Sequence, residues 1–214
     1  MRQFYLLDQK DIEGIGRQIQ KLQADSGSKT AEGLAAQVKK NRQIERAKAP
    51  ALFDELESKL LNNSSFQVYA SPKSLARLFI NIYEVGDYYG VHSDAPVIGR
   101  KATDLSFTIF LNDPSNYDGG ELSMKLPIGE LDVKLKSGWG VVYSTGVLHE
   151  VKKITRGRRI ALVGWVESFI KSEEDRNLLI ELADIKEDLK KQGLDDQAIK
   201  LNKIRNDLIR KMAR

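Results

Sequence analysis

The sequence of 214 residues predicts a mainly β core flanked by helices, an α+β fold class. Two observations lead to this prediction. The spacing of apolar residues changes from the helical period of 3.6 to the strand period of 2 near residue 74, and it returns to the helical period near residue 172. Between these points, short strand-like segments are separated by turn residues without intervening helical patterns. That succession favours an antiparallel sandwich or barrel over a doubly wound parallel sheet.

The first region, residues 1–65, has a mainly helical pattern and is expected to pack on the core. One apolar stripe follows an acidic N-cap at Asp8 or Asp11. Its members are Ile12, Ile15, Ile19 and Leu22. After a loop-like stretch at 24–28, a second helix is predicted to begin at Pro50, because proline suits the first helical turn.

The central region, residues 66–170, is the predicted β core. Five segments have strand length and are either alternating or continuously apolar. They are 75–83, 105–111, 131–135, 141–143 and 160–163. Turn signals such as Asp113-Pro114, Asp118-Gly119-Gly120 and Ser137-Gly138 separate them, as expected for an antiparallel core.

The last region, residues 171–214, is a predicted C-terminal helical extension. Ser172-Glu173-Glu174-Asp175 resembles a capping box, and Gly193 divides the region into two helices. Each helix has an apolar stripe. The stripes are Leu178, Leu182, Ile185 and Leu189, then Leu201, Ile204, Leu208 and Met212. We expect these stripes to pack on the core, or alternatively to form a homodimer.

Composition excludes several classes of function. The chain has no cysteine, which excludes disulfides, cysteine-ligated zinc, iron–sulfur clusters and thiol nucleophiles. Because no apolar run reaches the ~20 residues of a membrane span and the start lacks a signal-peptide core, we expect a soluble cytoplasmic protein that does not associate with membranes. The net charge is +4, and lysine and arginine residues are concentrated in the predicted C-terminal helices. This concentration indicates either contact with nucleic acid or a solvated helix face, and the acidic residues interspersed there favour the solvated face.

The only two histidines both lie in the β region. His92 and Asp94 are two positions apart, so they project to the same side of an extended segment. His149 follows 57 positions after His92, just beyond the predicted strand 141–143. Two imidazoles and one carboxylate can occupy one face of an octahedral metal and leave three positions open, as in non-haem Fe(II) oxygenases.

A candidate anion-binding residue follows on the next strand. Arg159 lies ten positions after His149, and its guanidinium can hold a dicarboxylate bidentately while the other end of that ligand chelates the metal. Strand parity places Arg159 on the same face as Trp165 and opposite to Arg158. If Trp165 packs inward, Arg159 is buried and Arg158 faces water. Three residues of strand 75–83 share one parity and are expected in the same pocket: Arg77, Asn81 and Tyr83.

Further motifs accompany these residues in a fixed order. Residues 83–94 read Tyr83-x-x-Gly86-x-x-Tyr89-x-x-His92-x-Asp94, and Gly119-Gly120-Glu121-Leu122 and Gly138 precede His149. The segments 36–43 and 105–111 complete the pattern. Over residues 33–185, this set resembles the Fe(II)- and 2-oxoglutarate-dependent dioxygenases of the prolyl 4-hydroxylase type, with the closest resemblance to the PKHD-type hydroxylases.

The resemblance implies a double-stranded β-helix, or jelly-roll, with Fe(II) held by the catalytic residues His92, Asp94 and His149. It implies that 2-oxoglutarate chelates the iron and reaches Arg159 with its far carboxylate, with Tyr83 as a second contact. Members of the family use O₂ to hydroxylate a C–H bond while 2-oxoglutarate becomes succinate and CO₂, and L-ascorbate commonly supports them. The expected substrate is a prolyl or other residue of a peptide or protein, with a small molecule or nucleobase as the alternative.

Two residues narrow the choice of branch within this family, and one segment is left with two interpretations. Trp165 occupies the position where the nucleic-acid demethylases carry a second arginine, so a nucleic-acid partner is not favoured. The carboxylate of Asp94 argues against the halogenase variant, in which a small residue frees a site for chloride. Residues 95–103 form either a mobile lid over the site or a plain loop.

Two competing hypotheses remain at this stage. One is a zinc-dependent hydrolase on the same ligands, which would have no use for Arg159 as a dicarboxylate anchor. The other is a non-catalytic binding module that uses the basic C-terminal helices.

Overall fold

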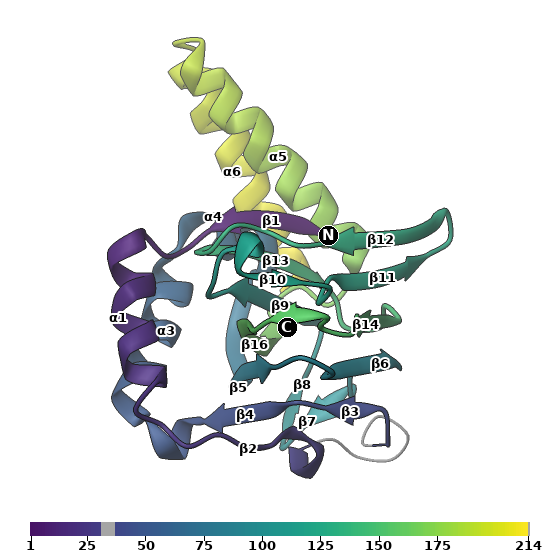
Figure 1. Cartoon of the computed structure of the whole chain (residues 1–214). Helices are drawn as coiled ribbons and strands as arrows, with labels where there is room; N and C mark the ends of the chain where they lie inside the picture. Colours follow the sequence, from purple (N-terminus) through teal and green to yellow (C-terminus); the bar gives the residue numbers. More distant parts are fainter. Residues whose placement is uncertain (31–36, 214) are drawn as a thin grey trace.

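The structure is a computed structural model that describes residues 1–30 and 37–213. Two antiparallel sheets form the middle of the molecule, and helices lie outside them (Figure 1). This arrangement confirms the predicted mainly β, α+β fold class. None of the helices in the described ranges combines the length and apolar character needed to cross a membrane.

The larger sheet has seven strands in the order β1-β13-β9-β16-β5-β4-β2, and all neighbours are antiparallel. The strands are β1 (Arg2–Tyr5), β13 (Trp139–Ser144), β9 (Leu105–Phe110), β16 (Arg159–Ser168), β5 (Pro72–Tyr83), β4 (Arg42–Glu45) and β2 (Asp25–Ser26). Because the two longest strands, β5 and β16, pair at its centre, their register decides which side chains face each side.

The smaller sheet has five strands in the order β12-β11-β14-β6-β3. They are β12 (Gly129–Val133), β11 (Leu122–Leu126), β14 (His149–Val151), β6 (Tyr88–His92) and β3 (Lys39–Lys40). Two short antiparallel pairs complete the β structure. They are β7 (Val97–Ile98) with β8 (Lys101–Ala102), and β10 (Tyr117–Asp118) with β15 (Arg156–Gly157).

The main apolar core lies between the larger sheet and the N-terminal helices. The helices are α1 (Gln9–Ile19), α3 (Pro50–Asn62) and α4 (Ser64–Ala70). Alternation along the strands separates the two faces of this sheet. Ile80 of β5 and Leu162 of β16 belong to the apolar cluster with the helices, whereas their neighbours Asn81 and Val163 line a cavity on the opposite face.

Most predicted helices and strands are confirmed. α1 begins after Asp8, whose carboxylate accepts a hydrogen bond from the backbone of Asp11, and α3 begins at Pro50. Ser172 caps α5 (Glu173–Lys191), and Gly193 separates it from α6 (Asp195–Met212). Four of the five predicted strands fall inside or nearly inside β5, β9, β13 and β16, and the fifth, 131–135, overlaps β12.

The expectation of a mainly helical first region is incomplete. β1 and β4 from this region extend the larger sheet, and β3 extends the smaller one. These strands have two to four residues each, which is too short for a periodic signal in the sequence. The predicted division of the chain at residues 65 and 170 stays a prediction.

The predicted apolar stripe of α5 is partly wrong, because Leu182 and Leu189 are half-buried but the other two members are exposed. Leu178 is 41% exposed and Ile185 is 50% exposed, whereas Leu179, Ile180 and Ala183 are buried. The cause is visible in Figure 1, where α5 and α6 form an antiparallel pair that projects away from the sheets. Much of α5 therefore has only α6 beside it. The stripe predicted for α6 is also partly wrong, because Ile204 is 52% exposed.

We predict that Gly138→Ala destabilises the protein more than Gly86→Ala does. Both glycines have a left-handed backbone, with φ of 84° and 86°, so alanine costs about 1–2 kcal/mol at either position. At Gly138 the added Cβ would also lie 2.0 Å from the carbonyl oxygen of Leu7, whereas at Gly86 it meets only the end of the Lys40 side chain at 3.7 Å. Urea unfolding of both variants measures the difference. Equal losses of unfolding free energy would contradict the close approach of the Leu7 backbone to this turn.

Candidate functional site

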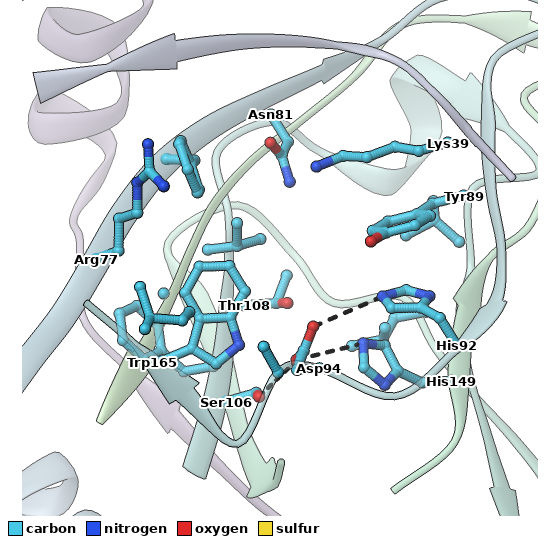
Figure 2. A pocket seen from close by; sticks show the side chains of 18 of the residues that line it. Lys39, Arg77, Asn81, Tyr89, His92, Asp94, Ser106, Thr108, His149 and Trp165 are labelled. Carbon is cyan, nitrogen blue, oxygen red and sulfur yellow. Dashed lines mark hydrogen bonds and ion pairs between the residues drawn. The ribbon is translucent and has the colours of Figure 1, made fainter. Parts of the chain in front are cut away.

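A cavity of about 360 Å³ lies between the two sheets. Its walls come from strands of both sheets and from the β7–β8 hairpin, and polar side chains point into it from several directions (Figure 2). The residues predicted from the sequence meet here. Those that line the cavity are Arg77, Asn81, Tyr83, His92, Asp94, His149, Arg159 and Trp165.

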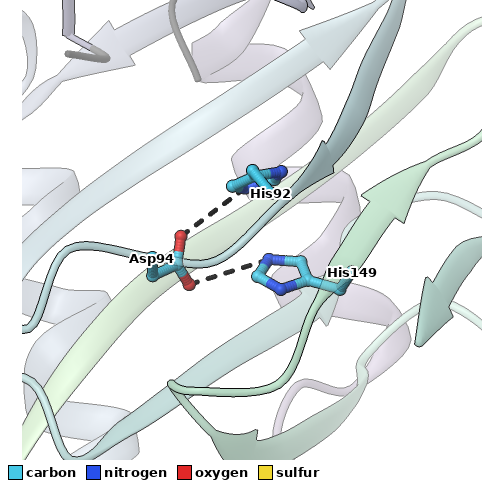
Figure 3. Close-up of side chains that lie close together, drawn as sticks. All are labelled: His92, Asp94 and His149. Carbon is cyan, nitrogen blue, oxygen red and sulfur yellow. Dashed lines mark ion pairs between the residues drawn. The ribbon is translucent and has the colours of Figure 1, made fainter. Parts of the chain in front are cut away.

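The two histidines and the aspartate form a compact cluster (Figure 3). His92 ends β6 and His149 begins β14, and the antiparallel register places them directly opposite each other. Asp94 lies two residues beyond His92, with Oδ1 3.6 Å from Nε2 of His92 and Oδ2 3.7 Å from Nε2 of His149. One ligand atom from each of the three lies within 4.8 Å of the others. This is a spacing that one metal ion can span.

Backbone carbonyls orient both imidazoles. Nδ1 of His92 lies 2.8 Å from the carbonyl oxygen of Gly90, and Nδ1 of His149 lies 2.8 Å from that of Val147. A carbonyl oxygen only accepts hydrogen bonds, so each Nδ1 donates, and a ring in its neutral form has the lone pair of Nε2 on the side of Asp94. Hydrogen bonds of this kind fix the tautomer and the ring orientation of metal-binding histidines.

The carboxylate of Asp94 is held by hydroxyl groups behind it. Ser106 on β9 donates a hydrogen bond of 2.7 Å to Oδ2 of Asp94, and its Oγ lies 3.0 Å from Oγ1 of Thr145. Neither serine nor threonine was predicted from the sequence. Ser106 lies within the buried strand β9 and Thr145 follows directly after β13, so only the three-dimensional pairing brings these two hydroxyl groups together behind Asp94.

The ionisation states of the cluster suit a cation. Burial raises the pKa of Asp94, but His92, His149 and the Ser106 hydroxyl outweigh burial and bring this pKa down to about 2. Burial lowers the pKa of His149, with Asp94 opposing this shift and His92 adding to it. At neutral pH the cluster therefore offers an ionised carboxylate and a neutral His149 imidazole, which are the forms that bind metals.

Arg159 is a buried cation in the lining of the cavity. It is 1% exposed, it pairs with Tyr83 across β16 and β5, and its guanidinium carbon lies 5.3 Å from the ring centres of Tyr83 and Phe110. Within the described residues, its Nε and Nη1 atoms have no hydrogen-bond partner. A buried guanidinium with unsatisfied donors is costly, so an anion bound beside Arg159 would be stabilised. Arg158 is exposed, as strand parity predicted.

The surroundings of Arg159 give the Gly119-Gly120 turn a physical role. A Cβ on Gly120 would lie 2.4 Å from Cδ1 of Ile154 and 3.0 Å from Cδ of Arg159, so only glycine leaves room for the arginine. Burial raises the pKa of Tyr83 to about 12, against the opposing charge of Arg159, so its phenol stays protonated and can donate a hydrogen bond. Tyr117 is fully buried beside the same turn and was not predicted as a site residue.

Two further features of the cavity were missed or left open. Lys39 lines it from β3, opposite Tyr89, whose ring stacks on His92 with centres 3.6 Å apart. Residues 95–103, expected to be a lid or a loop, contain the β7–β8 hairpin, and Val97 and Ile98 of that hairpin line the cavity. Of the resembling segment 36–43, Ala36 lies outside the described residues.

A jelly-roll core that places a His-Asp-His cluster and a buried arginine in one cavity defines the class of 2-oxoglutarate- and Fe(II)-dependent oxygenases. The family model described as 2OG-Fe(II) oxygenase superfamily matches residues 78–167. A prolyl hydroxylase from Trichoplax adhaerens, solved with a hypoxia inducible factor peptide fragment, shares the fold with a TM-score of 0.54 and 12% identity, over 83% of this chain and 86% of that one.

The family within this class follows from closer relatives. A PKHD-type hydroxylase of Maricaulis maris is 42% identical over 157 residues, which are 73% of this chain and 72% of the relative. One from Idiomarina loihiensis is 33% identical over 205 residues, covering 95% and 94% of the two chains. The chain belongs to the PKHD-type hydroxylases and is an oxidoreductase, so the zinc hydrolase and non-catalytic alternatives are set aside.

We predict that the stability of the protein rises with pH through the titration of Lys39. Burial lowers the pKa of its ammonium from 10.5 to about 8; Asp94 opposes this shift and Arg77 adds to it. Between these two pKa values the unfolded chain binds more protons than the folded chain, so the folded state gains stability as pH increases. Urea unfolding of wild type and Lys39→Met should show the stability advantage of the variant shrinking from about pH 8 to about pH 10.5. A difference that does not change with pH would contradict the burial of a charged lysine here.

Proposed function

We propose that this PKHD-type hydroxylase hydroxylates a prolyl or other residue of a peptide or protein, with Fe(II), 2-oxoglutarate and O₂. The observation that carries the proposal is the meeting of two complementary sites in one cavity. His92, Asp94 and His149 converge as groups that could hold a cation, and Arg159 has unpartnered donors that could hold an anion. A ligand with a chelating end and a distant carboxylate would satisfy both. The prolyl hydroxylase that shares this fold and was solved with a peptide fragment supports a peptide as substrate.

The first part of the proposal is that His92, Asp94 and His149 hold Fe(II). Their Nε2 and carboxylate atoms converge, both Nδ1 atoms are engaged by carbonyls, and the carboxylate is ionised. Three protein ligands on one face leave positions for a co-substrate and O₂. When bound, iron and 2-oxoglutarate supply the chemistry that oxidises a C–H bond with O₂ and releases succinate and CO₂.

The second part is that Arg159 holds the far carboxylate of 2-oxoglutarate and that Tyr83 donates a hydrogen bond to it. The unpartnered Nε and Nη1 atoms of Arg159 are the donors such a carboxylate requires, and a planar guanidinium can bind it bidentately. The protonated phenol of Tyr83 lies on the neighbouring strand. L-Ascorbate is proposed as the reductant that keeps the iron in its Fe(II) state.

The protein's own contribution is orientation and exclusion of water. Tyr143 is buried beside His149, with ring centres 5.3 Å apart, and the buried ring of Phe110 lies next to Arg159. These rings surround the polar cluster with an apolar boundary in which charge interactions are stronger than in water. No general acid–base pair is assigned to the protein's own side chains, because bound iron and 2-oxoglutarate would supply the chemistry that oxidises the C–H bond.

We predict that Arg159→Met weakens 2-oxoglutarate binding about 10- to 100-fold, the loss expected for a charged hydrogen-bonded pair. Titration calorimetry with the Zn(II)-loaded protein measures this without turnover. Folding stability should be unchanged or increased, because the guanidinium has unsatisfied buried donors. Arg158→Met, which alters the neighbouring exposed arginine, is the matched control and should bind normally. Equal affinity in both variants would refute the assignment of Arg159.

We predict that Ser106→Ala lowers metal affinity about 10- to 100-fold, because it removes the hydroxyl that fixes Asp94. Competition with a chelator gives the affinity. Ser106→Thr keeps a hydroxyl and should restore most of it, and Ser115→Ala on the surface should have no effect. Unchanged metal affinity in Ser106→Ala would show that Asp94 is oriented by other contacts.

A further inference from the structure

The cavity contains positive charge beyond the metal cluster and Arg159. Lys39 enters it from β3 and Arg77 enters it from β5, and Figure 2 shows them on either side of Asn81. Among the described residues that line the cavity, Asp94 is the only acidic one. The lining therefore has three cationic side chains, Lys39, Arg77 and Arg159, against one carboxylate, and Glu45 outside the lining pairs with Arg77.

Binding of the metal and 2-oxoglutarate would not remove the excess of positive over negative side chains in the cavity lining. A divalent metal adds two positive charges and the 2-oxoglutarate dianion adds two negative charges, so the loaded cavity has the same net charge as the empty one. Arg159 and the metal cluster account for both ends of 2-oxoglutarate. The remaining positive charge of the lining therefore lies on the Lys39 and Arg77 side of the cavity.

Lys39 is held close to this space by its surroundings. Its Nζ lies 4.9 Å from the ring centre of Tyr89, the tyrosine that stacks on His92. Burial lowers the pKa of Lys39 to about 8, and the nearby charge of Arg77 contributes to this. A negative group placed between Lys39 and Arg77 would offset the burial of the Lys39 ammonium and its repulsion by Arg77. Its binding would therefore be favoured electrostatically.

The groups around Arg77 and Asn81 add directed donors. The Arg77 guanidinium lies 4.7 Å from the ring centre of Phe79 and pairs with Glu45 at 3.2 Å, which fixes its plane while further N–H groups remain for another acceptor. Gln43 donates to Oδ1 of Asn81, so the amide nitrogen of Asn81 is turned toward the cavity (Figure 2). Donors from three side chains thus surround one region.

We propose that Lys39, Arg77 and Asn81 form a carboxylate-binding subsite, and that the substrate has a carboxylate close to the C–H bond that is oxidised. For a peptide substrate, this group is an aspartate or glutamate side chain near the target residue. The inference rests on the proposed function, because it takes the metal and Arg159 as the sites of Fe(II) and 2-oxoglutarate. It adds a specificity determinant that the metal cluster and Arg159 do not provide.

The test uses the full chain loaded with Zn(II) and saturating 2-oxoglutarate. The probes are the N-acetyl N-methylamides of aspartate and glutamate, each compared with the matching asparagine or glutamine compound, so that only the side-chain charge differs. Binding is measured by ligand-detected NMR or calorimetry. We expect at least one acidic probe to bind at least tenfold more tightly than its neutral amide partner.

Variants locate the subsite. Lys39→Met and Arg77→Gln should each reduce binding of the acidic probe at least tenfold while 2-oxoglutarate still binds. Lys40→Met is the matched control, because the neighbouring Lys40 is outside the cavity lining and pairs with Asp87 on the surface. It should bind the probe as wild type does.

The outcomes separate this inference from the proposed function. Absence of 2-oxoglutarate binding in the first step would overturn the proposed function. Normal 2-oxoglutarate binding with equal affinity for acidic and neutral probes, or with no binding of either acidic probe, would overturn the subsite alone. Retention of probe binding in both Lys39→Met and Arg77→Gln would also overturn it, because the carboxylate would then be held elsewhere.

Discussion

The register between β5 and β16 is the constraint on which the rest of the structure depends. Because side chains alternate along a strand, the pairing of Arg159 with Tyr83 sends both to the cavity and sends Ile80 and Leu162 to the helices. A slip of one residue would exchange the two sets, burying the arginine against apolar helices and filling the cavity with aliphatic side chains. The long pairing of β5 with β16 therefore fixes which side chains face the cavity. The apolar core on the other face of the sheet stabilises this register.

The same sheet explains how the fold tolerates an unfavourable site. Arg159 is buried with unsatisfied donors, and Asp94 and the two histidines are mostly buried beside each other. Each unsatisfied buried polar group costs on the order of 1–3 kcal/mol, which the apolar packing on the helical side must offset. The outcome is a cavity whose charges are organised before any ligand arrives, so little reorganisation is needed when a metal and a dicarboxylate bind.

Much of the site could be predicted from the sequence because it obeys local rules. The two-residue spacing of His92 and Asp94 and the strand parity of Arg159 place these side chains without tertiary information, and the cavity brings them together as expected. Lys39 could not be found in this way, because its strand has two residues and gives no periodic signal. The exposure of Leu178 and Ile185 was missed for a different reason. A stripe at helical spacing shows that a helix is amphipathic, but the neighbour that covers it is set by tertiary packing.

The central claim is that one cavity binds a metal at the His-Asp-His cluster and 2-oxoglutarate at both the metal and Arg159. Anaerobic titration of the Fe(II)-loaded protein with 2-oxoglutarate, followed by visible absorption, tests it most directly. The account predicts a weak charge-transfer band that saturates at one 2-oxoglutarate per chain and is abolished in His149→Ala. Failure of the band to form in the wild-type protein, or its persistence in His149→Ala, would contradict the account.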